Sequence, residues 1–361
     1  MPYYFNLPLI TNLTRDQRRA VDENNPLALS GGPGTGKSVV SLWRHITNHS
    51  TGLRNSLLLT YTKTLEHYLK ASANTQNVNA GNNIARTNCW LCDCPDNNVE
   101  RKNIEEIIID EGQDIIKDTF QRFFNYTNRI SYGADERQIM YLSGEEWAEL
   151  KNWFQTDDRF NNNRTSGTIE LKRNFRNSKE ILLFTRSVFP DFMISQNTIN
   201  EATTTGIKPI MKLHLGWGIE NQINSIVDII NIYKGAAHNI AVLIPFARDI
   251  DNYYNLIKNG LEENVEITKY QHENEQFNGL SGIHITTFRS SKGTEFDTVI
   301  IPEFHRFRAF IDHPTWEVTE NDYYVAFTRA KINLFLLCQN GLPYLGNTIN
   351  INNLQNTITQ E

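Results

Sequence analysis

Gly31-Gly32-Pro33-Gly34-Thr35-Gly36-Lys37-Ser38 matches the pattern G-x-x-x-x-G-K-[ST] at each fixed position. An apolar run at residues 27–30 precedes it, and a helical stretch at residues 37–48 follows it. Glycines let backbone N–H groups converge on phosphate oxygens, and the positive end of the helix favours the anion. The stretch therefore predicts a nucleotide-binding P-loop, in which Lys37 reaches the β- and γ-phosphates and Ser38 ligates Mg²⁺.

A second apolar run ends in two carboxylates, in the stretch Ile107-Ile108-Ile109-Asp110-Glu111. Ligands of doubly wound sheets bind at the carboxyl ends of the strands, where these acids would lie. We expect Asp110 to hold Mg²⁺, directly or through water, and Glu111 to orient and deprotonate an attacking water. Together the two stretches predict a P-loop nucleoside triphosphatase and leave its class open.

Short apolar runs alternate with helical stretches along the chain, which is typical of parallel strands buried on both faces. Strands are expected at residues 27–30, 57–60, 107–109 and 129–132, and again at 241–244, 265–268, 283–287, 298–301 and 334–338. Thr319 and Asp322 resemble a capping box that opens a helix running through Ala330. The predicted fold class is α/β, with two parallel sheets.

A polar stretch at residues 161–167 separates the two halves of this pattern and resembles a hinge. The expected domains are therefore residues 1–165 and 166–361.

The chain has 361 residues, of which 39% are hydrophobic and 21% are charged. This composition excludes global disorder. No apolar run is long enough to span a bilayer and no signal peptide is evident, so we expect a cytoplasmic protein without a membrane partner.

The net charge of −6 lowers the expectation of tight, non-specific DNA coating but does not exclude a local cationic groove.

With only four cysteines in a chain of this size, a disulfide scaffold is not expected. Cys89, Cys92 and Cys94 lie close together in sequence. Zinc requires four ligands, so this cluster needs Cys338 or a histidine to complete a metal site. Simple packing is the alternative interpretation.

The residues around the second carboxylate pair resemble a known family. Asp110-Glu111-Gly112-Gln113-Asp114 is similar to motif II of the UvrD/Rep/PcrA-like helicases of superfamily 1 (SF1A). Stretches similar to other motifs of this family occur in the same order: the Q motif at 13–17, Ia at 60–63, III at 133–138, IV at 171–176, V at 290–297 and VI at 324–331. The resemblance implies a compact form with two tandem RecA-like domains and ATP in the cleft between them.

The resemblance also implies a set of nucleotide contacts. Gln17 would read the adenine edge, and Phe175 would stack on the ring. Gln138 would contact the γ-phosphate. Arg176 and Arg329 would approach from the second domain as arginine fingers, because a planar guanidinium binds phosphate oxygens bidentately. The remaining implied nucleotide contacts are the P-loop residues Gly31, Gly32, Pro33, Gly34, Thr35, Gly36, Lys37 and Ser38, together with Gly293 and the ribose-binding Glu295.

The implied partner is single-stranded DNA, with 3′→5′ movement, because Asn174-Phe175-Arg176 and residues 292–296 look UvrD-like. Cationic and aromatic side chains along the expected strand track would hold phosphates and stack on bases. The predicted strand contacts are Tyr61, Lys63, Thr87, Trp90, Phe288, Arg289 and Lys292.

The chain departs from the family in leaving little room for the large insertions of full-size members. Only 44 positions separate Lys63 from Ile107 (107 − 63 = 44). We expect intact ATP hydrolysis without processive unwinding by this chain alone. A rival interpretation is a nucleotide-gated, DNA-sensing subunit that regulates a partner nuclease in DNA repair or antiviral defence. RNA remodelling is a third interpretation.

Overall fold

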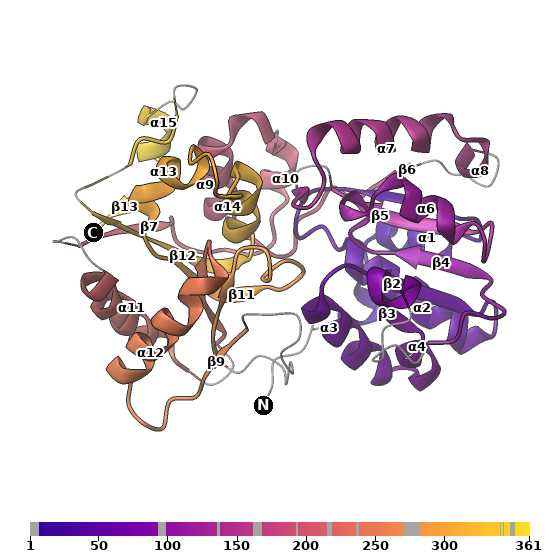
Figure 1. Cartoon of the computed structure of the whole chain (residues 1–361), viewed down its shortest axis with the longest axis horizontal. Helices are drawn as coiled ribbons and strands as arrows, with labels where there is room; N and C mark the ends of the chain where they lie inside the picture. Colours follow the sequence, from indigo (N-terminus) through magenta and orange to yellow (C-terminus); the bar gives the residue numbers. More distant parts are fainter. Residues whose placement is uncertain are drawn as a thin grey trace. The chain divides into compact units, whose positions relative to one another are not determined.

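The computed structural model describes residues 7–92, 99–135, 138–161, 168–192, 194–214, 219–235, 238–270, 282–339, 341, 343–346 and 351–361. The chain divides into an N-terminal unit, Tyr4–Lys172, and a C-terminal unit that contains Arg173–Glu361 (Figure 1). The predicted boundary after residue 165 lies seven positions earlier than this division (172 − 165 = 7). The difference arises because the strand that follows residue 165 pairs with the first sheet.

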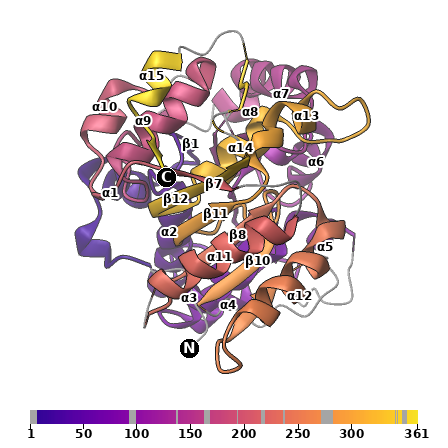
Figure 2. The same ribbon diagram turned by 90° about the vertical axis from the view of Figure 1, so that its left-hand side faces the viewer.

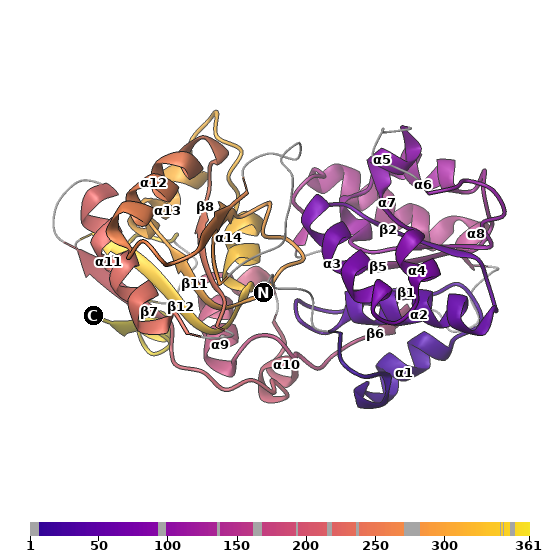
Figure 3. The same ribbon diagram turned by 90° about the horizontal axis from the view of Figure 1, so that it is seen from below.

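The N-terminal unit is a six-stranded parallel sheet of order β3-β2-β4-β5-β1-β6. Its strands are β1 (Ala28–Ser30), β2 (Ser56–Thr60), β3 (Ile84–Arg86), β4 (Glu106–Ile109), β5 (Ile130–Ala134) and β6 (Thr168–Glu170). Its helices are η1 (Ile10–Asn12), α1 (Arg15–Asp22), α2 (Lys37–Thr51), α3 (Lys63–Asn74), α4 (Val78–Asn82), α5 (Thr87–Leu91), η2 (Gly112–Asp114), α6 (Lys117–Phe123), α7 (Gly144–Thr156) and α8 (Asp158–Asn161). Figure 3 shows α1 and α2 on one face of this sheet and α6, α7 and α8 on the other.

The C-terminal unit is a seven-stranded parallel sheet of order β13-β7-β12-β11-β8-β10-β9. Its strands are β7 (Ile210–His214), β8 (Ile240–Ile244), β9 (Ile267–Lys269), β10 (Ile283–Thr287), β11 (Phe296–Ile301), β12 (Ala330–Gln339) and β13 (Thr359–Gln360). Its helices are α9 (Lys179–Val188), η4 (Pro190–Phe192), α10 (Gln196–Asn200), α11 (Ile219–Tyr233), η5 (Ala247–Asp249), α12 (Ile250–Gly260), η6 (Phe304–Arg306), α13 (Phe307–Ile311), α14 (Glu320–Phe327) and α15 (Ile351–Gln355). Figure 2 shows α11 and α12 on one face of this sheet and α9 and α14 on the other.

The central strands are apolar because helices cover both of their faces. Every residue of β2, β4, β8 and β10 is buried. In the N-terminal unit, two hydrophobic clusters lie on opposite faces of the sheet, one under α1 and α2 and the other under α6 and α7. No helix in the described part of the chain is long and apolar enough to cross a membrane.

The predicted strands at 57–60, 107–109, 241–244 and 283–287 are confirmed, and so is the capping box of Thr319 and Asp322. The helix predicted through Ala330 ends at Phe327, because Ala330 begins β12 and pairs with Phe296. The strand β7 was not predicted, since its sequence alternates with Lys212 and His214 and lacks a continuous apolar run. Most of the proposed hinge, residues 162–167, lies outside the described residues.

Candidate nucleotide site and strand contacts

The P-loop joins β1 to α2, and two of its glycines are required by close contacts. Gly36 is the N-cap of α2 with φ +90°, and a Cβ there would lie 2.5 Å from Nε2 of Gln17. Gly31 has φ +147°, and a Cβ would lie 2.5 Å from the carbonyl oxygen of Leu171. Side chains at either position would therefore collide with atoms that hold the loop. The predicted contacts Gly32, Pro33 and Gly34 lie between these two points.

Gln17 connects α1 to the P-loop. Its backbone and side chain form a capping box with Thr14, so Oε1 accepts a hydrogen bond from the N–H of Thr14 at 2.9 Å. Its Nε2 donates to the carbonyl oxygen of Thr35 at 3.0 Å, and Thr35 Oγ1 in turn donates to the carbonyl of Gly32. Gln17 therefore fixes the shape of the loop in addition to its predicted role at adenine.

The side chain of Lys37 folds back onto the P-loop. Its Nζ donates to the carbonyl oxygens of Gly31 at 2.8 Å and Gly32 at 3.0 Å, and it lies 3.7 Å from a carboxylate oxygen of Asp135. The side chain is 8% exposed. The ammonium group is thus held by groups of the P-loop and of the end of β5.

Asp110 follows β4 and is buried beside Ser38 and Lys37. Burial and the neighbouring Glu111 raise the pKa of Asp110 to about 7, while the Ser38 hydroxyl, which donates a hydrogen bond to it, and the charge of Lys37 oppose the rise. Its Oδ2 has no hydrogen-bond partner among the described residues although it is buried. A buried carboxylate oxygen without a partner is costly. The Ser38 hydroxyl and this oxygen are the hard oxygen donors that Mg²⁺ prefers, so these two residues fit the ion.

Glu111 begins a series of hydrogen-bonded residues at the carboxyl edge of the N-terminal sheet. Its backbone is left-handed, with φ 60°, which is unusual for a residue with a side chain. Nε2 of Gln113 donates to Glu111 Oε2 at 2.5 Å, and Oε1 of Gln113 accepts from the N–H of Asp135 at 3.0 Å. Nε2 of Gln138 donates to Asp135 Oδ2 at 2.7 Å. This series links the end of β4 to the end of β5.

Gln113 and Asp135 were not predicted as site residues. They occur in the stretches that resemble motifs II and III, but their roles depend on a contact between residues 22 positions apart. Glu136 and Arg137 of the motif III stretch lie outside the described residues. The available signal was that both residues are polar and lie shortly after buried strands: Asp135 directly follows β5, and Gln113 comes four residues after the end of β4.

In the C-terminal unit, Arg176 is paired with Glu295. Its Nε donates to Glu295 Oε2 at 3.0 Å, and its terminal nitrogens make no hydrogen bond with any described residue. The neighbouring Phe175 is 38% exposed, with the guanidinium of Arg173 5.3 Å from its ring centre. Gly293 has φ +83° in the loop that precedes Glu295. The structure thus brings together two of the residues predicted at the nucleotide, Arg176 and Glu295, and Gly293 lies two positions before Glu295 in the same loop.

Arg329 differs from Arg176 because it is buried, with 1% of its surface exposed. Its Nε donates to the carbonyl of Val325 at 3.1 Å, and its terminal nitrogens donate to the carbonyl of Thr294 and to Thr328 Oγ1, both at 3.3 Å. In this conformation the guanidinium connects the end of α14 to the loop that precedes β11.

The predicted strand contacts of the N-terminal unit divide into two groups. Tyr61 is half-buried and its ring lies 4.4 Å from that of Tyr141, while Lys63 opens α3. Trp90 is fully buried and packs on Tyr126, and Thr87 is buried with its hydroxyl donating to the carbonyl of Thr60. A buried indole offers no face on which a base can stack, so Trp90 acts here as a core residue.

The predicted strand contacts of the C-terminal unit follow β10. Phe288 is buried and its ring lies 4.9 Å from that of Tyr323, so it also cannot stack on a base in this conformation. Lys292 is buried as well. Arg289 is part-exposed and donates through Nε to Asp322 at 3.0 Å.

The cysteine cluster shows no metal site within the described residues. Sγ of Cys89 accepts a hydrogen bond from Arg86, Cys92 is exposed and Cys338 is buried in β12. Cys94 lies outside the described residues.

The fold is similar to that of solved helicase structures. Saccharomyces cerevisiae Dbp5 bound to RNA and ADP BeF3 matches with 11% identity, 96% of this chain, 89% of that chain and a TM-score of 0.55. The C-terminal domain of a possible DNA helicase from Lactobacillus plantarum WCFS1 matches with 18% identity, 52% of this chain, 98% of that chain and a TM-score of 0.38. The arterivirus helicase, nonstructural protein 10, matches with 13% identity, 90% of this chain, 61% of that chain and a TM-score of 0.41. The likeness to Dbp5 confirms the predicted α/β fold with two RecA-like domains.

A search of curated proteins gave no match. The model of the UvrD-like helicase C-terminal domain matches residues 62–341, which include parts of both units and lie after the P-loop. This range covers more than three-quarters of the chain. The chain therefore belongs to the family of the UvrD-like helicase C-terminal domain.

Proposed function

We propose that this chain is an ATP-dependent translocase or helicase that moves 3′→5′ on single-stranded DNA. The observation that carries the proposal is the group formed by the P-loop, Lys37, Ser38 and the buried, unpartnered oxygen of Asp110. In a member of a helicase family, this group is best explained by a triphosphate site.

The residues of the N-terminal unit would bind and orient the triphosphate. Lys37 would exchange its bonds to the loop carbonyls for bonds to the β- and γ-phosphates. Ser38 and Asp110 would hold Mg²⁺, which when bound offsets the negative charge of the phosphate oxygens. Glu111 would orient the attacking water and accept its proton, with the carboxylate held by Gln113.

Arginines of the C-terminal unit would stabilise the charge that develops on the leaving phosphate. Arg176 suits this role because Glu295 holds only its Nε, so the two terminal nitrogens can bind phosphate oxygens bidentately. Arg329 would first have to release the carbonyls of Val325 and Thr294. We therefore assign the larger direct contribution to Arg176.

The DNA strand would contact both units at the ends of their strands. Tyr61 and Lys63 follow β2, and Arg289 follows β10, so each lies at a carboxyl edge. The preference for DNA and the direction rest on the likeness of residues 174–176 and 292–296 to the UvrD-like pattern.

Movement along a strand can be tested by displacement of streptavidin from biotinylated single-stranded DNA. With ATP, we expect streptavidin at the 5′ end to be removed faster than streptavidin at the 3′ end. The Glu111→Gln variant should remove streptavidin from neither end. Equal, ATP-independent release at both ends would contradict the proposed movement.

The rival function, a nucleotide-gated subunit that regulates a nuclease, is favoured by one specific observation. The segment between α3 and β4, residues 75–105, has 31 residues, and those of them that the structure describes form the small elements α4, β3 and α5 (105 − 75 + 1 = 31). This leaves no room there for a duplex-splitting insertion. Strand-stimulated ATP turnover without streptavidin displacement would select the rival.

A further inference from the structure

Two buried asparagines connect the backbone at Arg176 to the backbone at Arg329. Asn174 and Asn177 lie between β6 and α9, and neither side chain is exposed. Oδ1 of Asn174 accepts hydrogen bonds from the N–H groups of Arg176 at 2.9 Å and of Asn177 at 2.8 Å. Its Nδ2 donates to Oδ1 of Asn177 at 3.1 Å. The Asn174 side chain therefore closes a tight turn at Arg176 and orients the amide of Asn177.

The amide of Asn177 holds the two carbonyl groups that flank Arg329. Its Nδ2 donates to the carbonyl oxygen of Thr328 at 3.0 Å and to that of Ala330 at 2.7 Å. An amide NH2 group has two hydrogens, so each carbonyl accepts one, and the opposite orientation of the amide would place oxygen against oxygen. The carbonyl of Arg329 accepts from the N–H of Phe296 at 2.9 Å. Three consecutive carbonyls are thus held where the Arg329 side chain leaves the backbone.

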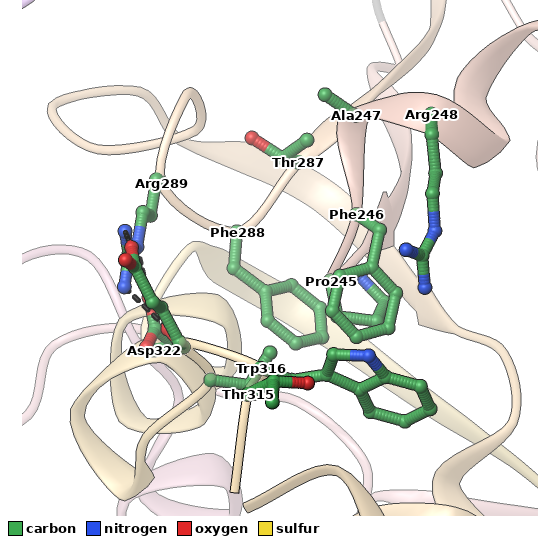
Figure 4. Close-up of a pocket in the computed structure, with 12 residues that line it drawn as sticks. Pro245, Phe246, Ala247, Arg248, Thr287, Phe288, Arg289, Thr315, Trp316 and Asp322 are labelled. Atoms are coloured by element: carbon green, nitrogen blue, oxygen red, sulfur yellow. Dashed lines mark hydrogen bonds and ion pairs between the residues drawn. The ribbon is translucent and has the colours of Figure 1, made fainter. Parts of the chain in front are cut away.

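The first turn of α14, at the other end of the helix that leads to Arg329, is held by separate contacts. Nε of Arg289 donates to Asp322 of this turn at 3.0 Å, as Figure 4 shows. A pocket of about 400 Å³, in which the rings of Phe246 and Trp316 pack 5.1 Å apart, lies beside it. Because the first turn has its own contacts, we expect a change at Asn177 to displace only the last turn of α14 and the start of β12.

We propose that Asn177 is a positioning residue that holds Arg176 and Arg329 in one geometry for the same phosphate. In the proposed function, on which this inference rests, both arginines stabilise the charge that develops on the leaving phosphate. The guanidinium of Arg329 has to release the carbonyls of Val325 and Thr294 to reach a phosphate, whereas the bonds of Asn177 to the backbone can persist. The side chain of Arg329 would then move about a backbone whose place relative to Arg176 is set by one amide.

Steady-state ATP turnover by the whole chain tests this role. Asn177→Ala removes both donors, so kcat should fall by about 10²-fold, the cost of misplacing a group by roughly 1 Å. KM for ATP should change little, because the arginines act in the transition state and the P-loop is unchanged. Asn177→Ser keeps one donor in a smaller side chain, so its kcat should lie between those of the wild type and Asn177→Ala. Asn177→Ser also carries the test if melting temperatures show that Asn177→Ala does not fold.

Asn333→Ala is a matched control. Asn333 is a buried asparagine of β12 in the same unit, and its Nδ2 donates to Oγ1 of Thr298 at 3.0 Å. Its substitution also removes a buried hydrogen bond, but one that reaches neither arginine. The melting temperature of Asn333→Ala should fall as that of Asn177→Ala does, while its kcat stays near that of the wild type. Equal losses of kcat in the two variants would reduce the effect of Asn177 to general destabilisation and overturn its positioning role.

The same substitution in a chain without the two arginines gives a second readout. A residue that acts through Arg176 and Arg329 adds nothing once both are absent. Asn177→Ala combined with Arg176→Ala and Arg329→Ala should therefore turn over ATP within a few-fold of the variant that lacks only the arginines. A further fall of about 10²-fold would show that Asn177 acts by another route.

The outcomes separate the role of Asn177 from the proposed function. If Arg176→Ala and Arg329→Ala both retain wild-type turnover, the arginines have no part in hydrolysis, and the role of Asn177 fails with them. If the arginine variants lose turnover while Asn177→Ala and Asn177→Ser keep it, only the role of Asn177 is contradicted.

Discussion

At the carboxyl edge of the N-terminal sheet, charged and amide side chains bond to one another, whereas the loops after β8 and β10 of the C-terminal sheet enclose aromatic rings. The first edge holds Lys37, a buried Asp110 and the series from Glu111 to Gln138. The second holds Phe246 and Trp316. The same parallel topology thus carries two kinds of edge, one lined by charged and amide side chains and one lined by aromatic rings. The difference teaches that the loops after the strands, and not the sheets, determine what each edge can bind.

Arg176 is an exception to this contrast between a charged N-terminal edge and an aromatic C-terminal edge. It is a cation of the C-terminal unit, and we assign it a role in phosphate chemistry. Arg176→Ala should lower ATP turnover by about 10³-fold or more, the range found for arginine fingers. The melting temperature should change little, since the side chain is paired only with Glu295. Steady-state ATPase measurements check this, with Arg186→Ala as a surface control. Turnover within a few-fold of wild type would remove Arg176 from the mechanism.

A substitution of Glu111 tests whether the carboxyl edge of the N-terminal sheet hydrolyses ATP. Glu111→Gln should lower ATP turnover by about 10²- to 10⁴-fold, because the amide cannot accept the proton of the attacking water. Nucleotide affinity should persist, since the P-loop and Lys37 are unchanged. Turnover and binding of a fluorescent ATP analogue can be measured on the same preparation, with Glu149→Gln, an exposed carboxylate, as the control. Near-normal turnover would exclude Glu111 as the base.

Arg329 is expected to act on stability more than Arg176 does. Arg329→Ala should lower the free energy of unfolding by about 2 kcal/mol, because the buried carbonyl of Thr294 loses the donor of Arg329 and the carbonyl of Val325 keeps only the Thr328 hydroxyl. Arg18→Ala, which breaks an exposed ion pair with Asp22, should cost about 0.5 kcal/mol or less. Urea unfolding measures both changes. Equal losses in the two variants would mean that Arg329 does not brace the turn after α14.

The two cores, unlike the two edges, share one feature: a buried, neutral histidine. Burial lowers the pKa of His45 in the N-terminal unit and of His284 in the C-terminal unit to about 3. The unfolded chain binds a proton near pH 6.5, so stability falls as the pH drops below 6.5 and continues to fall toward 3. Each histidine should cost about 2 kcal/mol at pH 5 relative to neutral pH.

This acid sensitivity is checked by urea unfolding between pH 7 and pH 5. His45→Gln and His284→Gln should each be less stable at neutral pH but lose less on acidification than the wild type. Acid sensitivity in His45→Gln and His284→Gln equal to that of the wild type would contradict the buried neutral state of both rings, since the raised pKa of Asp110 acts with the opposite sign in all three proteins.

The sequence predicted the parts of the site whose chemistry requires fixed spacing. The P-loop and the carboxylate pair after β4 were found because a run of glycines and two adjacent acids are visible without a structure. The relay from Glu111 through Gln113 to Asp135 could not be predicted, since it depends on hydrogen bonds across two strands.

The aromatic residues show what the sequence patterns could not predict. Trp90 and Phe288 lie on the expected strand track in the sequence but are buried, because resemblance to a family does not report which way a ring points. Phe246 and Trp316 were not predicted, since 70 residues separate them and only the fold brings the loop after β8 against the segment that leads into α14 (316 − 246 = 70). Burial and loop proximity are therefore what the structure adds.

The most direct test of the central claim is ATP turnover by the whole chain with and without single-stranded DNA. We expect turnover that rises with single-stranded DNA, rises less with duplex or RNA, and disappears in Lys37→Ala while that variant stays folded. Turnover that no nucleic acid changes, or that survives Lys37→Ala, would contradict an ATP-driven motor on DNA.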